Sequence, residues 1–430
     1  MLQATLLCIV LICVPIKSSA IINRFEECVL DPKLVQEIAS YKNVTQQIMK
    51  EIINYYGEDM YKEYEKFIDV FGARPSGSDV LEQPYSKNIA ILGFGTSVST
   101  PSEGITAEAI VVNSFEALDK LEKSKIKGKI VVFDAHYVTY GDTVIYRSQG
   151  ATKASKKGAI ATLVRSITPF SIYSLHTGAQ FYGDSVTKIP TAAITHEDAD
   201  LMRRLQDRGE KIVLHIKMFS TFYVKKSRNT IIDLNGKEHP EKQVIVSGHI
   251  DSWDVGTGAM DDGGGMMISW FVPVILNKLN LKPKRTVRAI LWTSEEPGLV
   301  GAAAYLNKHI NELDNINFIM ESDEGTFKPL GLDVAGSNTA RCIIKEILNL
   351  FAPIDKMTNS GGPGSDIVLF VRKGLPGASL LNANERYFWF HHSEGDTMNV
   401  QSKPDVIECA AFWAAISYII ADLSVDIPRA

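Results

Sequence analysis

The chain has 430 residues, of which 45% are hydrophobic and 22% charged, and its formal net charge is −5. This length is enough to bury a large core and predicts two or three domains. Its mild acidity argues against nucleic acids and anionic membranes as partners. We therefore expect a globular protein that binds neither nucleic acid nor membrane.

The first twenty residues, MLQATLLCIVLICVPIKSSA, predict a secretory signal peptide. They are almost wholly apolar up to Ile16, and Ser18 and Ala20 occupy the two positions that a signal peptidase reads. Because the apolar run is too short to span a bilayer, cleavage is favoured over anchoring. Cleavage removes Lys17 and leaves 44 basic against 50 acidic residues, a net charge of −6. No later stretch is long and apolar enough for a membrane span, which predicts a secreted protein, with the lysosome as an alternative destination.

Three cysteines would remain in the mature chain, which is too few for a disulfide framework. They allow either one disulfide and a free thiol or no disulfide: Cys28, Cys342 and Cys409. The only acceptor sequon for N-glycosylation is Asn43-Val44-Thr45.

Two regions precede the polar motifs. Spaced apolar residues between positions 31 and 69 predict one or two helices, followed by the loop FGARPSGS. Residues 88–216 interleave charged helical stretches with strand-like runs, and predict a small β-rich domain without a ligand cluster. The strand-like runs are IAILG, AIVVN, GKIVVFD, AIATLVR and IVLHIKM, and the helical stretches are SFEALDKLEKSKI and THEDADLMRRLQDRG.

From residue 229 onward, continuous apolar runs alternate with helical segments such as 265–279 and 339–350. This pattern predicts an α/β fold with a mostly parallel sheet flanked by helices. Candidate ligands lie at the carboxyl ends of several of these strands, where open α/β sheets bind ligands. The expected strands are NTIIDLNG, KQVIVSGHID, TVRAILWTSEE, NINFIMESDEG and ASLLNAN.

His249 and Asp261 are the first two candidate metal ligands. Residues two apart on an extended strand face the same side, so Asp251 can orient the His249 imidazole. Asp261 and Asp262 precede three glycines that open a helix, whose dipole favours negative charge. The alternatives are a structural histidine and an N-cap with a tight turn. Together the histidine and the aspartates favour a metal site.

Glu295 and Glu296 end the next strand and project in different directions. One can bind metal while the other accepts a proton from the attacking water. Asp323 follows another strand beside Glu321 and Glu324. For both segments the alternative interpretation is a solvated acidic turn or cluster.

The last candidate ligand is His392, although a lone histidine is more often a core residue. It stands immediately before Ser393, and Asp396 is near enough in sequence to orient it. His391 is then expected to point away.

Together these residues predict two metal sites that share Asp261. His249 and Asp323 bind one ion, and Glu296 and His392 bind the other. Mixed nitrogen and oxygen ligation without thiolate suits Zn²⁺ and leaves coordination positions open. Two such ions can polarise a carbonyl and activate water.

The motifs SGHIDSWDVGTGAMDDGGG, WTSEEPG, MESDEGTF and YFWFHHSEGDTM resemble those of the M28 metallopeptidases over nearly the whole mature chain. The resemblance implies a zinc-exopeptidase-type fold with an inserted protease-associated domain, and a homodimer that hydrolyses dipeptides or short peptides. It implies two Zn²⁺ ions, with Glu295 as the general base and five ligands: His249, Asp261 as the bridge, Glu296, Asp323 and His392.

The resemblance also implies a domain layout after the signal peptide (1–20). It assigns a propeptide (21–43), the N-terminal part of the catalytic domain (44–87), the protease-associated insert (88–216) and the dizinc catalytic domain (217–430). The chain departs from the family pattern after Gln83, where a helix and a strand are missing, and at Glu394, which replaces a histidine. Pocket members expected from their closeness to the motifs are Ser365, Asp366, Arg386 and Tyr387.

Two other functions remain open on the same fold. One is a non-catalytic ectodomain with a degenerate ligand set, which the retention of all five ligands and the base argues against. The other is a single-zinc acyl transferase similar to glutaminyl cyclase, which metal stoichiometry would distinguish from a peptidase.

Overall fold

The computed structural model describes residues 86–359 and 364–429, and six isolated positions between 32 and 46. The chain divides into two compact units, Met1–Ser86 and Lys87–Ala430, and only the second is described below. The predicted signal peptide, Cys28 and the departure after Gln83 lie outside the described residues. So do the predicted propeptide and the early helices, apart from the isolated positions.

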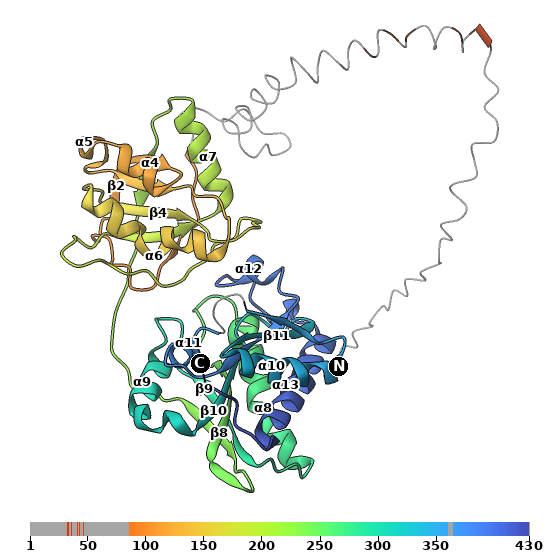
Figure 1. Ribbon diagram of the computed structural model, residues 1–430. Coiled ribbons are helices and arrows are strands. Elements are labelled where there is room, and N and C mark those ends of the chain that lie inside the picture. The colour runs from red at the N-terminus through yellow and green to blue at the C-terminus, as the bar shows by residue number, and fades with distance from the viewer. Residues whose placement is uncertain are drawn as a thin grey trace, which may run out of the picture. The chain divides into compact units, whose positions relative to one another are not determined.

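The first sheet of the second unit has six strands in the order β1-β5-β4-β3-β2-β6. Strands β2 to β5 are parallel, while β1 and β6 pair antiparallel at the two edges. All five expected runs form strands, and β5 is an additional one. The bounds are β1 (Leu92–Gly93), β2 (Ile105–Val112), β3 (Ile130–Phe133), β4 (Ala161–Arg165), β5 (Thr191–Ile194) and β6 (Val213–Ile216) (Figure 1).

Helices cover both faces of this first sheet. Phe115 of α4 and Ala151 of α6 belong to the core on one face, and Met202 of α7 belongs to the core on the other. Helix α6 was not predicted from the sequence; it begins where the Thr139 hydroxyl accepts a hydrogen bond from the Asp142 N–H (3.1 Å). The bounds are α4 (Phe115–Lys120), α5 (Lys123–Ile126), α6 (Tyr140–Lys156) and α7 (His196–Asp207).

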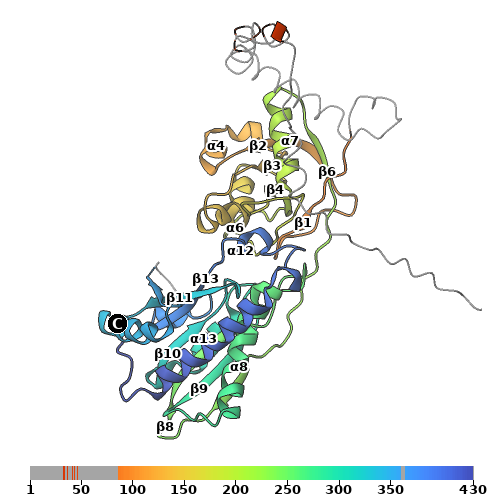
Figure 2. The same cartoon turned by 90° about the vertical axis from the view of Figure 1, so that its right-hand side faces the viewer.

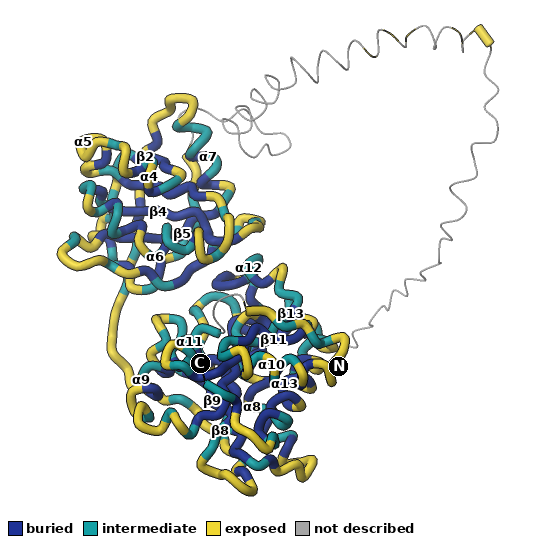
Figure 3. Tube along the Cα trace, in the orientation of Figure 1, coloured by how far each residue is buried: buried dark blue, intermediate teal, exposed yellow. Residues whose placement is uncertain are grey.

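The second sheet has seven strands in the order β12-β11-β13-β10-β8-β9-β7. Its central strands β13, β10, β8 and β9 are parallel, which confirms the predicted α/β class. Strand β7 runs antiparallel to β9, and β11 runs antiparallel to β13 but parallel to the edge strand β12. Figure 3 shows the central strands buried, which explains their continuous apolar runs. The bounds are β7 (Thr230–Leu234), β8 (His239–His249), β9 (Arg285–Trp292), β10 (Ile316–Glu321), β11 (Pro329–Ala335), β12 (Lys356–Thr358) and β13 (Gly377–Asn382).

Helices also cover both faces of the second sheet. Helices α8, α10 and α13 share one core with the sheet, and α9 and α11 share another; Figure 2 shows α8 and α13 side by side across the strands. The helices expected over 265–279 and 339–350 are both present. The α-helical bounds are α8 (Gly264–Lys278), α9 (Val300–Lys308), α10 (Asn338–Leu348), α11 (Val368–Val371), α12 (Tyr387–Phe390) and α13 (Lys403–Asp422). Shorter helical turns are η3 (Ala259–Gly263), η4 (Ile310–Asn315), η5 (Asn349–Phe351) and η6 (Met398–Val400).

Helix α13 corrects one expectation from the sequence. By length and composition it is apolar enough to cross a membrane, although no such stretch was predicted after the signal peptide. Its Phe412, Trp413 and Ile420 are buried in the core of the second sheet. Packing against the sheet and α8 accounts for its apolar character, as for the core helix of a globular domain.

Truncation of Phe318, at the centre of β10, tests this core. Its side chain is fully buried against both the sheet and the covering helices. Phe318→Ala is expected to lower the free energy of unfolding by about 3–5 kcal/mol, because burial is lost and a cavity remains. Urea denaturation would measure this, with Phe219→Ala as the control because Phe219 is 88% exposed. Equal stabilities of the two variants would contradict the packing described here.

Candidate metal centre

Neighbouring strand ends bring the predicted ligands to one edge of the second sheet. Strands β8 and β9 are parallel, and their register pairs His249 with Trp292, three residues before Glu295. On the other side of β8, strand β10 ends at Glu321, which pairs with Ser247 of β8. Asp323 follows Glu321 by two residues. The carboxyl ends of parallel strands therefore gather three of the five candidate ligands. Asp261 comes from η3, and His392 comes from the loop after α12.

The Asp261 carboxylate faces two groups of ligands at once. Its Oδ1 lies 3.2 Å from His249 Nε2, which is itself 3.1 Å from Asp323 Oδ1. Its Oδ2 lies 3.1 Å from His392 Nε2, which is 3.1 Å from Glu296 Oε2. One carboxylate thus stands between a His249–Asp323 pair and a Glu296–His392 pair, the arrangement expected from the sequence.

The buried atoms of this cluster fit cations. Among the described residues, Asp261 Oδ2 and Glu296 Oε1 are buried without a hydrogen-bond partner. Such orphaned carboxylate oxygens are costly unless a cation compensates them. Burial is the main cause that raises the pKa of Glu296, and the negative charge of Asp261 adds to it. Burial also raises the pKa of Glu295, to about 9, with a further contribution from the negative charge of Asp323. The crowded carboxylates and the two imidazole nitrogens form a donor set suited to zinc.

The Nδ1 atoms of His249 and His392 face backbone carbonyls, which leaves their Nε2 atoms free to bind a metal. His249 Nδ1 lies 2.8 Å from the Asp251 backbone carbonyl, and His392 Nδ1 lies 3.1 Å from that of Thr177. A carbonyl oxygen can only accept, so we infer that Nδ1 carries the proton in both rings. The Nε2 lone pairs then face the carboxylates, as in metal-binding histidines.

Asp251 and Asp396 orient backbone rather than the imidazole rings. The Asp251 carboxylate accepts hydrogen bonds from the N–H groups of Glu295 (3.0 Å) and Glu296 (3.3 Å). Its distance from His249 Nδ1 is 3.9 Å, so the expected ring contact is made by its carbonyl instead. Asp396 accepts from the N–H groups of Met260 (2.8 Å) and Asp261 (3.2 Å) and makes no described contact with the His392 ring. Both carboxylates therefore hold the backbone of candidate ligands rather than their side chains.

Asp262 differs from Asp261 although the two are adjacent. Its carboxylate accepts from the N–H groups of His249 and Gly265, both at 3.0 Å. A Cβ at position 265 would lie 1.9 Å from the Ser322 carbonyl oxygen, so only glycine fits this approach of α8 to the strand ends. Asp262 and the glycines thus fix the start of α8 against β8.

His391 does not point away, contrary to the expectation from the sequence. Its ring stacks on that of His392 with centroids 3.5 Å apart, and its Nε2 lies 3.4 Å from Asp261 Oδ2. Burial, and then the neighbouring His392, hold the pKa of His391 well below its usual value. His391 is therefore a close neighbour of the candidate bridging carboxylate.

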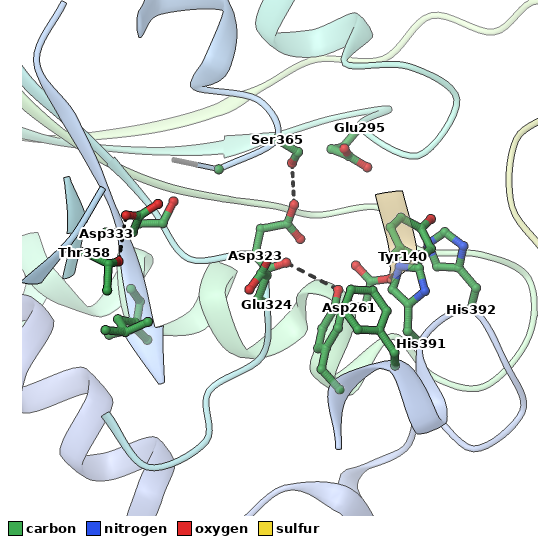
Figure 4. A pocket seen from close by; sticks show the side chains of 16 residues that line it. Tyr140, Asp261, Glu295, Asp323, Glu324, Asp333, Thr358, Ser365, His391 and His392 are labelled. Carbon is green, nitrogen blue, oxygen red and sulfur yellow. Dashed lines mark hydrogen bonds and ion pairs between the residues drawn. The ribbon is translucent and has the colours of Figure 1, made fainter. Parts of the chain in front are cut away.

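A cavity of about 350 Å³ opens beside this cluster (Figure 4). Ser365 lines it and donates a hydrogen bond to the Asp323 carboxylate, and Tyr387 also lines it, as expected. Asp366 and Arg386 are not among its lining residues. Tyr140, from the unpredicted helix α6, lines the cavity as well. Its only sequence signal is the capping pattern of Thr139 and Asp142, which marks a helix start but not a site.

Similarity to known proteins agrees with this geometry. A model of peptidase family M28 matches residues 229–417. Carboxypeptidase Q of Xenopus laevis is 44% identical over 436 residues, which cover 91% of this chain and 92% of the relative. The chain belongs to peptidase family M28. As an M28 member it is a metallo-exopeptidase, and the predicted family is confirmed.

Solved M28 structures share the fold. A peptidase M28 precursor from Shewanella amazonensis SB2B aligns with a TM-score of 0.78 and 30% identity, and the alignment covers 81% of each chain. A zinc aminopeptidase from Bacillus subtilis aligns with a TM-score of 0.61 and 20% identity over 80% of this chain and 84% of that one, a likeness of fold alone. The M28 assignment and the groups of candidate ligands in this chain support zinc as the metal.

Proposed function

We propose that this M28 peptidase uses two zinc ions to hydrolyse dipeptides or short peptides, with Glu295 as the general base. The observation that carries the proposal is the Asp261 carboxylate, whose two oxygens face separate pairs of ligands. His249 and Asp323 would hold one ion, Glu296 and His392 the other, and Asp261 would bridge them.

When bound, the two ions would polarise the scissile carbonyl and lower the pKa of the attacking water. Glu295 lines the cavity and makes no described contact with either histidine. The Asp251 carboxylate accepts hydrogen bonds from the backbone N–H groups of Glu295 and of the candidate ligand Glu296, and so fixes both residues. Glu295 is therefore positioned to accept the proton of the attacking water and to return it to the leaving amine.

The cavity indicates what part of a peptide is recognised. Its volume of about 350 Å³ is at the lower end for small-molecule sites, which favours short substrates. Its described lining contains no lysine or arginine but five carboxylates. Besides the candidate ligands Asp261 and Asp323 and the candidate base Glu295, these are Glu324 and Asp333, which form an acidic wall. We propose that this acidic wall recognises the free α-amino group of the substrate.

A panel of dipeptides tests both proposals. Free dipeptides are expected to be cleaved, N-acetylation should lower kcat/KM by about 10- to 100-fold because a charged hydrogen bond is lost, and C-terminal amidation should have a smaller effect. Exhaustive chelation should abolish cleavage, and added zinc should restore it. Cleavage by protein shown to be free of metal would refute the catalytic proposal, and a larger effect of amidation would refute amine recognition.

The apolar N-terminal segment and the M28 resemblance also underlie three proposals on maturation and organisation. We propose that the protein is secreted or lysosomal after removal of residues 1–20 and a propeptide within 21–43, and that it is a homodimer. The separate first sheet supports the assignment of 88–216 as a protease-associated insert before the 217–430 catalytic domain. N-terminal sequencing and sedimentation of protein secreted by animal cells would test maturation and dimerisation; a retained leader or a monomer would contradict them.

A further inference from the structure

The backbone of His392 is held by a residue of the first-sheet domain, which comprises the first sheet and its helices from β1 to β6 (residues 92–216). The Thr177 N–H donates to the His392 carbonyl (2.9 Å), and the Thr177 carbonyl lies 3.1 Å from His392 Nδ1. His392 has φ = 59°, in the left-handed region that a residue with a side chain adopts at a cost of about 1–3 kcal/mol. Two hydrogen bonds to one residue therefore offset this cost and fix both backbone and ring.

The same Thr177 carbonyl is held from behind by Arg147 of α6. Arg147 is only 5% exposed, and its Nη1 donates to the Thr177 carbonyl (2.9 Å) and lies 3.5 Å from His392 Nδ1. Its Nη2 donates to the Tyr140 hydroxyl (2.8 Å), and its Nε donates to the Ala179 carbonyl (3.3 Å). A Cβ at Gly178, where φ is +143°, would lie 2.2 Å from Arg147 Cζ, so this close approach requires glycine.

A structural arginine at this depth normally pairs with a carboxylate. Within the described part of the chain, Arg147 instead directs its guanidinium to backbone carbonyls and a tyrosine hydroxyl. The Arg147 guanidinium and the His392 Nδ1–H both donate to the Thr177 carbonyl oxygen. Arg147 therefore holds this carbonyl in the orientation that meets His392.

Further contacts from the first-sheet domain hold the rest of this segment. His176 Nδ1 lies 2.6 Å from the His391 carbonyl, and the Thr168 hydroxyl donates to the Phe388 carbonyl (2.6 Å). Tyr140 stacks on Phe388 with centroids 4.8 Å apart. The first-sheet domain thus holds the backbone of residues 388–392 without supplying a candidate ligand itself.

We propose that Arg147 and Thr177 are positioning residues for the metal ligand His392. The Arg147-held carbonyl of Thr177 accepts the Nδ1–H, which points the Nε2 lone pair at Asp261 and Glu296. The other site has no such dependence, because His249 Nδ1 bonds to the carbonyl of Asp251 two residues away. The ion held by Glu296 and His392 therefore depends on the first-sheet domain, whereas the ion held by His249 and Asp323 does not. This inference rests on the proposed two-zinc function.

Zinc binding by Arg147 variants tests the proposal. Zinc affinities are measured by competition with a chromophoric chelator, and Co²⁺ spectra report each site after substitution. Arg147→Met is expected to bind one ion normally and the second about 10- to 100-fold more weakly, the usual effect of losing a group that orients a ligand. Arg147→Lys retains a donor for the Thr177 carbonyl and should show a smaller loss at the same site.

The matched control is Arg165→Met in the same domain. Arg165 is similarly buried, at 6% exposed, but pairs with Asp134 and Asp200 rather than with the His392 segment. It should retain both zinc affinities even if its stability falls.

Unchanged affinities in Arg147→Met, or an equal loss in Arg165→Met, would overturn the proposal. If Arg147→Met does not fold, Arg147→Lys must show the selective weakening of the second site. Zinc affinities of Arg147→Lys equal to those of the wild type would then overturn the proposal. A wild-type chain that binds only one zinc would instead overturn the two-zinc function itself, before any variant is compared.

Discussion

Glu295→Gln is expected to retain both zinc ions and to lose nearly all peptide hydrolysis. Glutamine preserves the shape of the side chain but cannot accept the proton of the attacking water. The loss of a general base typically lowers kcat by about 10²- to 10⁴-fold. Because the ligand Glu296 is unchanged, zinc content measured by elemental analysis should equal that of the wild type.

The control is Glu238→Gln, which removes an exposed carboxylate just before β8, at the end away from the site. It should leave both kcat and zinc content unchanged. If Glu295→Gln hydrolysed dipeptides at the wild-type rate, another group would be the base. If it instead lost zinc in proportion to activity, Glu295 would be a ligand rather than a base.

Asp261→Asn should be the most damaging single change to the site. The amide keeps one oxygen, but it removes the charge and offers an NH₂ group to one of the two facing histidine nitrogens. Both ions would lose a shared anionic ligand, whereas His249→Ala would remove a ligand from only one of them. We expect zinc content below one ion per chain and kcat/KM lower by at least about 10³-fold, since metal activation supplies several kcal/mol.

Asp254→Asn is the matched control, because Asp254 lies in the connection between β8 and η3 but is exposed. It should bind two ions and keep full activity. An Asp261→Asn protein with both zinc ions bound at wild-type affinity would contradict the bridging position of Asp261.

The part of the site that could be predicted lies at strand ends. His249, Glu295, Glu296 and Asp323 follow continuous apolar runs, and parallel pairing brings such ends together without knowledge of the strand order. The α/β class follows from the same runs. Short-range pattern was therefore enough for the class and for most of the candidate ligands.

The other parts depend on contacts between segments far apart in the chain. Arg147 and Thr177 are separated from His392 by more than 200 residues, and nothing in their local sequence marks them. The stacking of His391 on His392 follows from backbone angles that sequence does not display. The Asp251 carboxylate meets two backbone N–H groups rather than the predicted imidazole ring, because the turn at Glu295 folds back onto it.

The dispersion of the ligands also bears on the folding of the chain. His249 and Asp323 come from two strand ends and His392 from a late loop, so ions at this centre would cross-link segments that are distant in the unfolded chain. An ion bound only by the native state stabilises it by mass action, by about 2.7 kcal/mol at a free concentration 100 times Kd. The supply of zinc where the chain folds would then influence how much protein reaches the native state, independently of the need for zinc in peptide hydrolysis.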